Sequence, residues 1–358
     1  MEPQLLLALM LVPYSIIGLI IVSKARGKKN IKDYDLRPSV TVYVPTFNEE
    51  KHIARKLENL LSQTYPIEEI LIFDCSADRT VQIIEEYQKT IPSIKLVRQQ
   101  QRIGMAKTLN EAFKVAKGEI FVKTDCDSIS DTNALRELVA NFANKKVGAA
   151  TGICISEKGV EKYFRKFMTA IQVAESNIDS TLIAHSTSLL AFRTSLVEPV
   201  KPNSVADDTE EFLLIRKNGF RTIIDPTVIS QEEVPADHAT RRMQKNRRSQ
   251  GVVKVLLENI DMILNPRYRW YGAIVLPMEW FILILSPILL IAFGAILTYA
   301  IYLVHPLLAT IFIGIVAAAI IQRSNMLFAI IDTQLSGLAG FFKSVLKGNG
   351  DGLWRKVR

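Results

Sequence analysis

The chain is poor in cysteine and contains fewer acidic than basic side chains. Its only cysteines, Cys75, Cys126 and Cys154, lack the short Cys/His spacing of a zinc site, and their number is too low for a disulfide-rich secreted framework. We therefore expect reduced cysteines that serve as packing residues. No internal repeat or low-complexity segment is present, so the 358 residues are expected to form about two domains.

The shortage of acidic residues leaves a formal net charge of +8. Much of this charge flanks apolar runs or lies in residues 240–248. Attraction to anionic lipid headgroups explains such a distribution more simply than nucleic acid binding does. We expect a lipid bilayer as a partner and no nucleic acid.

Long apolar runs cover residues 5–22, 281–304 and 306–321. Each is close to or above the roughly 18–20 residues that a transmembrane helix needs. The first run lacks the basic start and small-residue cleavage site of a signal peptide, which favours a retained anchor. We predict an integral protein of the cell membrane with three spans. Residues 326–346 are interrupted by polar side chains, so this segment is expected to be interfacial or re-entrant.

Five basic residues follow the first apolar run: Lys24, Arg26, Lys28, Lys29 and Lys32. Positive residues beside a span favour the cytoplasmic side, which predicts that the central region is cytoplasmic. The expected organisation is an anchor with a basic flank over residues 1–30, a cytoplasmic domain over 38–265, transmembrane and interfacial helices over 266–345, and a basic cytoplasmic tail over 346–358.

Strand and helix patterns alternate through the first half of the cytoplasmic domain. Apolar, β-branched runs predict strands over residues 39–44, 70–73, 94–97 and 120–123. Apolar residues at helical spacing predict helices between them, over residues 49–61, 80–89 and 105–116. This alternation predicts an α/β fold with a mostly parallel sheet.

Polar residues follow three of these strands, over residues 45–50, 74–80 and 125–127. The carboxyl ends of parallel strands share one edge of a sheet, where open α/β folds bind their ligands. Asp125 and Asp127 offer the carboxylate oxygens that Mg²⁺ prefers, together with phosphate oxygens. Taken alone, each segment is equally consistent with ordinary turn or helix-capping chemistry.

Together these segments resemble the nucleotide-sugar-binding half of family 2 glycosyltransferases, which have the GT-A fold. The family pattern has Pro-x-Tyr/Phe-Asn-Glu after one strand, Asp-Asp-x-Ser-x-Asp-x-Thr after the next, and then Asp-x-Asp. The matching residues are Pro45, Phe47, Asn48, Glu49, Asp74, Ser76, Asp78, Thr80, Asp125 and Asp127. A further family motif, Arg-x-Gly-Lys-Ala, is present as residues 102–106 with Met105 in place of the lysine.

The resemblance implies a donor site for a nucleoside-diphosphate sugar, with UDP favoured over GDP. Pro45, Phe47 and Glu49 would line the nucleotide pocket. Asp74 would hydrogen-bond the base, and Arg102 would lie near it. The ligands of a Mg²⁺ or Mn²⁺ ion would be Asp125 and Asp127, which would also bind the donor.

An acidic segment over residues 206–213 resembles the family's Glu-Asp-Thr-Glu-Leu segment. The resemblance makes Asp208 the general base, with Asp207 beside it, because an inverting transfer needs a carboxylate that takes the acceptor proton. The alternative is an acidic helix start that only complements the helix dipole.

Gln244 and Arg247 match the Gln-x-x-Arg-Trp segment of membrane synthases that make hyaluronan, chitin or cellulose, but Arg248 replaces the tryptophan. This replacement counts against processive polymer synthesis. An arginine there favours a phosphate-bearing acceptor such as a polyprenyl phosphate, since guanidinium pairs well with phosphate. Trp354 in the basic tail is interpreted either as a flap over the diphosphate or as an anchor at the membrane interface.

The leading hypothesis is a membrane-bound, metal-dependent, inverting hexosyltransferase that acts on a lipid-linked or glycan acceptor. One alternative is a processive polysaccharide synthase that extrudes its product. Another is a catalytically silent membrane subunit that binds a nucleotide sugar. A nucleotidyltransferase is disfavoured, because the turn after the first strand is not the glycine-rich, basic phosphate loop of such enzymes.

Overall fold

The computed structural model describes residues 3–25, 30–155, 159–182, 188–232, 238–322 and 326–346. The chain forms two compact units. The first, which we call the sheet unit, comprises the described residues within 28–156 and 179–241. The second, the helical unit, comprises those within 1–27, 157–178 and 242–348.

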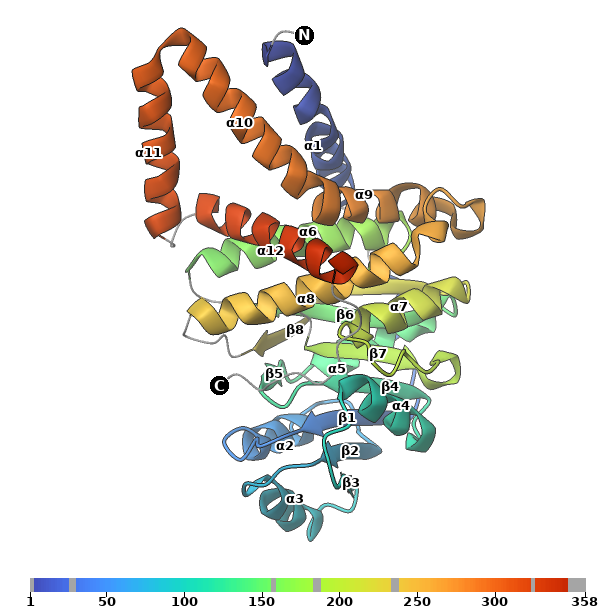
Figure 1. Ribbon diagram of the computed structural model, residues 1–358. Helices are drawn as coiled ribbons and strands as arrows, with labels where there is room; N and C mark the ends of the chain where they lie inside the picture. The colour runs from blue at the N-terminus through green and yellow to red at the C-terminus, as the bar shows by residue number, and fades with distance from the viewer. Residues whose placement is uncertain are drawn as a thin grey trace. The chain divides into compact units, whose positions relative to one another are not determined.

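The sheet unit contains an eight-stranded sheet with the order β3-β2-β1-β4-β7-β6-β8-β5 (Figure 1). The strands are β1 (Val40–Thr46), β2 (Glu69–Asp74), β3 (Ile94–Arg98), β4 (Ile120–Thr124), β5 (Ser128–Ser130), β6 (Val147–Ile155), β7 (Leu189–Arg193) and β8 (Arg221–Glu232). Strands β1 to β4 pair in parallel, as do β6 and β8, whereas β7 runs antiparallel to β4 and β6, and β5 to β8. The predicted α/β fold with a mostly parallel sheet is confirmed.

Helices cover both faces of this sheet. Buried side chains of α2 (Ile53–Leu61), α3 (Thr80–Gln88) and α5 (Ala134–Ala140) pack on one face. Those of α4 (Met105–Val115) and α7 (Asp207–Lys217) pack on the other. Side chains alternate along a strand, so neighbouring residues of β1 and β4 contribute to opposite layers of the core. Burial of each large aliphatic side chain contributes about 1.5–3 kcal/mol, which makes the sheet a rigid platform for its loops.

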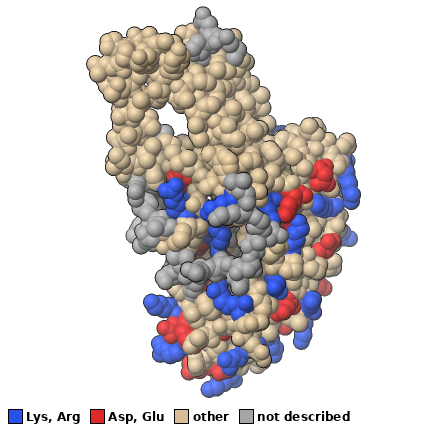
Figure 2. Space-filling model, viewed as in Figure 1, with Lys and Arg blue, Asp and Glu red and all other residues tan. Residues whose placement is uncertain are grey.

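The helical unit contains α1 (Pro3–Ala25), α6 (Gly159–Ile178), most of α8 (His238–Glu258), α9 (Leu276–Trp280), α10 (Ser286–Val304), α11 (Pro306–Gln322) and α12 (Met326–Leu346). This unit also has single 3-10 turns at Ile260–Met262 and Pro266–Tyr268 and single π-helical turns at Tyr271–Val275 and Phe281–Leu285. The sheet unit has 3-10 turns at Asn141–Ala143 and Thr194–Leu196. Segments Gln4–Ala25 and Tyr271–Val304 are long and apolar enough to cross a membrane, while the apolar Pro306–Gln322 is shorter. Figure 2 shows that the surface over α10 and α11 carries no charged side chain.

Helix α12 packs against α8 of the same unit. Lys245 of α8 forms an ion pair of 2.9 Å with Asp332. At Gly340 a Cβ atom would lie 2.9 Å from the backbone nitrogen of Gln250, so the absent side chain allows α12 to approach α8 closely. Ser344 donates a hydrogen bond to the Gln250 carbonyl.

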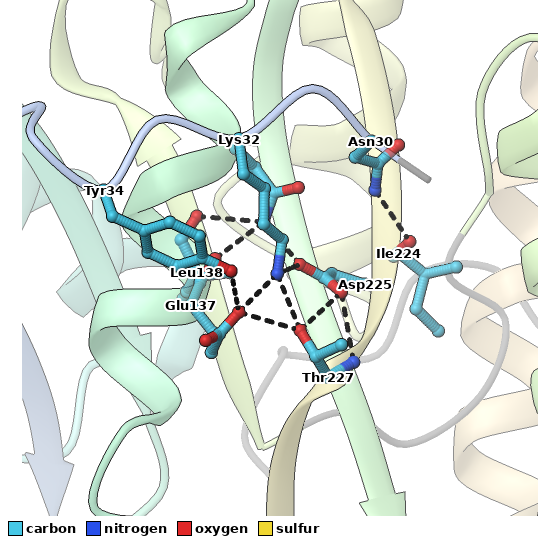
Figure 3. A network of polar contacts seen from close by, with 9 residues as sticks. Asn30, Lys32, Tyr34, Glu137, Leu138, Ile224, Asp225 and Thr227 are labelled. Atoms are coloured by element: carbon cyan, nitrogen blue, oxygen red, sulfur yellow. Dashed lines mark hydrogen bonds and ion pairs between the residues drawn. The ribbon is translucent and has the colours of Figure 1, made fainter. Parts of the chain in front are cut away.

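Residues 30–35 are held against α5 and β8 of the sheet unit by the network of polar contacts drawn in Figure 3. The Lys32 ammonium lies 2.5 Å from Glu137 of α5 and 2.5 Å from Asp225 of β8. It also donates to the Thr227 hydroxyl at 2.7 Å. Asp225 is buried, so this cation compensates a carboxylate that would otherwise be costly to desolvate.

Replacing Lys32 by methionine is therefore expected to destabilise the sheet unit by about 2–3 kcal/mol, because charged hydrogen bonds to two carboxylates are lost. Urea denaturation of the purified protein measures this change as a lower midpoint. The control is Lys51→Met at an exposed lysine, which should change the free energy of unfolding by less than about 0.5 kcal/mol. Equal midpoints for the two variants would contradict the prediction.

Candidate active site

The turn after β1 and the loop after β2 are joined by hydrogen bonds at the carboxyl edge of the sheet. The Asn48 backbone nitrogen donates to the Ser76 hydroxyl at 2.7 Å, and the Glu49 nitrogen donates to the Thr80 hydroxyl at 2.8 Å. Asn48 has a φ of 53°, a left-handed conformation that asparagine adopts more readily than most residues. These bonds fix the backbone between Pro45 and Glu49.

Asp74 is the buried centre of this pair of loops, with 1% of its surface exposed. Its carboxylate accepts hydrogen bonds from the Thr46 hydroxyl at 2.6 Å and from the Ser76 hydroxyl at 2.6 Å. The Ser76 backbone nitrogen donates a third bond at 2.8 Å. Asp74 thus holds the two loops together, and its contact with a nucleotide base stays a prediction.

The side chains of Phe47 and Arg102 contact each other beside these two loops. The Arg102 guanidinium lies 4.1 Å from the centroid of the Phe47 ring, a distance typical of a cation–π contact. Both side chains are partly exposed, so their outer faces are accessible. Met105, which replaces the family lysine, is the first residue of α4. Its sulfur accepts a long hydrogen bond of 4.0 Å from the Tyr43 hydroxyl. The nearest lysine in sequence, Lys107, is exposed.

Asp125 and Asp127 lie in the turn between β4 and β5, and both are partly exposed. The turn is held from inside by Lys56, a fully buried residue of α2. Its ammonium donates to the Thr124 hydroxyl at 2.7 Å and to the Ser128 carbonyl at 2.9 Å. Burial lowers the pKa of Lys56 to about 8, against the attraction of nearby Asp125.

This turn fits a hard divalent cation bound partly by substrate. Among the described residues, no group of three or more His, Cys, Asp and Glu side chains forms a complete protein cage for a metal ion. Mg²⁺ and Mn²⁺ sites of nucleotide-dependent enzymes commonly use one or two carboxylates plus phosphate and water oxygens. Asp125 and Asp127 provide that ligand type at an accessible strand end.

The acidic start of α7 is tied to β4 by Lys123. The buried Lys123 ammonium forms ion pairs with both Asp207 and Asp208. The Asp207 side chain is 12% exposed and the Asp208 side chain 34%, so Asp208 is the more accessible carboxylate. Asp208 therefore lies beside β4, the strand that leads into the turn containing Asp125.

Burial raises the pKa of Asp208 to about 6, and repulsion from Asp207 adds to this rise, while attraction to Lys123 opposes it. Burial alone would lower the pKa of Lys123, but the surrounding carboxylates raise that pKa well above its ordinary value. At neutral pH the cluster thus contains an ammonium group and an ionised, partly exposed Asp208. A carboxylate with a pKa near 6 is well matched to general-base chemistry.

Three other predicted site residues belong to the helical unit. Gln244, Arg247 and Arg248 lie on α8 and are partly exposed. Their predicted contact with the acceptor remains a prediction. Trp354 lies outside the described residues.

The sequence interpretation overlooked Lys56 and Lys123. Both interrupt apolar patterns: Lys123 ends the run Ile120–Val122, and Lys56 lies on the buried face of α2 beside Ile53 and Leu57. A lysine at a position that the pattern predicts to be buried requires a polar partner, and this signal could have identified both residues.

The chain matches a known protein family over the segment that contains most of these residues. The family model described as "Glycosyl transferase family 2" matches residues 41–223, which include β2 to β4, α7 and all of β1 except its first residue. The chain belongs to glycosyl transferase family 2. The family 2 fold and the predicted resemblance are thus confirmed.

Several proteins resemble this family 2 chain. The structure of the mannosyltransferase PcManGT from Pyrobaculum calidifontis, in complex with GDP-Man and Mn²⁺, has a TM-score of 0.78 and 26% identity, covering 95% of this chain and 99% of that one. Hyaluronan synthase of Streptococcus pyogenes serotype M3 is 33% identical over 35% of this chain and 30% of its own length. Beta-monoglucosyldiacylglycerol synthase of Trichormus variabilis is 31% identical over 40% of this chain and 31% of its own. The chain thus spans about a third of the length of these two curated relatives.

Proposed function

We propose that this glycosyltransferase moves a hexose, with inversion, from a nucleoside-diphosphate sugar to a lipid-linked acceptor. The observation that carries the proposal is the pair of ion pairs that Lys123 forms with Asp207 and Asp208, which brings the α7 carboxylates next to β4, the strand that leads into the Asp125–Asp127 turn. An inverting transfer needs a site for a diphosphate and a base beside it, and this arrangement provides carboxylates suited to both tasks.

On the donor side, Pro45, Phe47 and Glu49 line the nucleotide pocket, and Arg102 stacks against Phe47 beside the base. Asp74 orients the loops around the base. Asp125 and Asp127 would hold Mg²⁺ or Mn²⁺, and such an ion would supply positive charge to offset that of the diphosphate. The GDP-Man and Mn²⁺ of the Pyrobaculum structure support a donor and metal of these classes and place GDP-mannose beside UDP-hexoses among the donors to test.

On the acceptor side, Asp208 accepts the proton of the acceptor hydroxyl. The acceptor oxygen forms a bond to the anomeric carbon while the bond from that carbon to the diphosphate breaks on the opposite face. The nucleoside diphosphate leaves with the bonding electron pair, so the configuration at the anomeric carbon is inverted. Lys123 and Asp207 keep Asp208 beside the end of β4 during this step.

A lipid-borne acceptor is favoured by the helical unit. Uncharged α10 and α11 belong to the same unit as Gln244, Arg247 and Arg248 of α8. Arginine suits a phosphate headgroup, and apolar helices suit its hydrocarbon chain. The name of the Trichormus relative also describes a glycolipid synthase. A processive polymer synthase is the second candidate, supported by the likeness to hyaluronan synthase.

The two long apolar segments and the relatives indicate association with a membrane. Three spans, formed by α1, Tyr271–Val304 and α11, with the sheet unit in the cytoplasm, are part of the proposal. The basic residues after α1 support this orientation.

The deciding assay incubates the full-length protein with UDP-hexoses or GDP-mannose, Mn²⁺ and membrane lipids. Release of a nucleoside diphosphate together with a labelled, organic-extractable product is expected. A labelled polymer of high mass would favour the second candidate. Release of pyrophosphate, or donor binding without turnover, would contradict transferase activity.

Asp127→Ala is expected to weaken Mn²⁺-dependent donor binding at least about tenfold, because it removes a carboxylate ligand. Isothermal titration of the donor with and without Mn²⁺ measures the effect. Asp35→Ala removes an exposed carboxylate remote from the turn in sequence and serves as the control. Unchanged metal-dependent binding in Asp127→Ala would exclude this residue as a ligand.

Asp208→Asn should preserve donor binding and lower transfer by at least about 10²-fold, since an amide cannot accept the proton. Transfer rates and donor affinity are measured on the same preparation. Glu85→Gln, at an exposed position of α3, controls for the loss of one negative charge. Transfer by Asp208→Asn at a rate close to that of the unmodified enzyme would remove Asp208 from the role of base.

The pH dependence of kcat/KM provides a separate test. The base must be unprotonated, and burial raises the pKa of Asp208 to about 6. Transfer should therefore be constant above that pH and fall about tenfold for each unit below it. A rate that stays constant down to pH 4.5, while the protein remains folded, would contradict the assignment.

A further inference from the structure

We propose that Lys123 is a positioning residue, which holds the Asp208 carboxylate in the orientation needed to accept the acceptor proton. This inference rests on the proposed function and extends it to a residue outside the family motifs quoted above. Its basis is the contact of one buried ammonium group with both carboxylates at the start of α7.

The placement of Lys123 follows from the alternation of β4. Thr124 belongs to the layer of α2, where Lys56 and the Ser188 carbonyl bind its hydroxyl. Lys123 therefore extends into the opposite layer, where Phe121 packs with Phe212 of α7 in one apolar cluster. Only 4% of the lysine is exposed, so water cannot replace its carboxylate partners.

Asp207 and Asp208 need such a partner because they are adjacent like charges on one helical turn. The α7 dipole favours negative charge at this end but does not fix the direction of a side chain. A cation that contacts both carboxylates offsets their repulsion and restricts the rotation of Asp208. Because Lys123 precedes Asp125 by two residues, the same strand positions the base and the donor-side carboxylates.

A purely structural role would be compensation of buried negative charge without any effect on the orientation of the base. The two roles can be separated by charge counting. The cluster of Lys123, Asp207 and Asp208 has a net charge of −1. Lys123→Met changes it to −2, and the double variant Lys123→Met/Asp207→Asn restores −1 while Asp208 still lacks its cation.

Lys123→Met is expected to lower kcat for transfer about 10²-fold, the effect of misplacing a reacting group by about an ångström. Donor KM and Mn²⁺-dependent donor affinity should change less than about threefold. The double variant should regain the thermal stability of the unmodified enzyme but keep a kcat well below that of Asp207→Asn alone. Recovery of kcat together with stability would overturn the proposal and leave only charge compensation.

Lys56→Met is the matched comparison, since Lys56 is also a fully buried lysine at the same end of β4 but binds the Asp125–Asp127 turn. Its loss should weaken metal-dependent donor binding and raise donor KM. A kcat loss without a donor-binding effect, equal to that of Lys123→Met, would contradict a specific role for Lys123.

These measurements also separate this inference from the proposed function. If the unmodified enzyme transfers no hexose from any donor, the proposed function fails before any variant is compared. If it is active and Lys123→Met retains its kcat, only the positioning role fails. If Lys123→Met does not fold, the double variant decides, because its cluster has the original net charge.

Discussion

The contact of Lys123 with Asp207 and Asp208 is the interaction on which the candidate active site depends. It joins α7 to β4, two elements separated by more than eighty residues of sequence. Without a cation at this point, the start of α7 would bring two carboxylates beside the acidic turn after β4. The partial burial of two adjacent carboxylates is costly, and a buried ammonium group that contacts both offsets part of that cost.

A second buried lysine supports the same strand from the opposite face. Lys56 fixes both ends of the turn that contains Asp125 and Asp127, through Thr124 and Ser128. The two lysines thus have separate tasks, one for the donor-side turn and one for the candidate base. Both are held by a tightly packed sheet, which is how a rigid scaffold presents loops for chemistry.

The sequence predicted the features that depend on local patterns: β1 to β4, the helices between them and the polar residues at their carboxyl ends. It did not predict β7, which inserts between β4 and β6 and runs antiparallel to both, because strand order depends on distant pairing. The roles of Lys56 and Lys123 were missed for the same reason. Their partners lie between 68 and 85 residues away in sequence, so only the folded chain shows why a lysine is buried there.

The division into two units suggests how donor chemistry and acceptor selection are distributed. The residues proposed to bind the donor, Lys123 and Asp208 all belong to the sheet unit, so the proposed transfer chemistry lies within one unit. The helical unit combines uncharged helices with the basic side chains of α8, one of which, Lys245, is ion-paired with Asp332 of α12. In the proposed function, this unit recognises the hydrocarbon tail of the acceptor through its uncharged helices and the anionic headgroup through its basic side chains. Variation of the helical unit would then change the acceptor while the donor chemistry of the sheet unit is preserved.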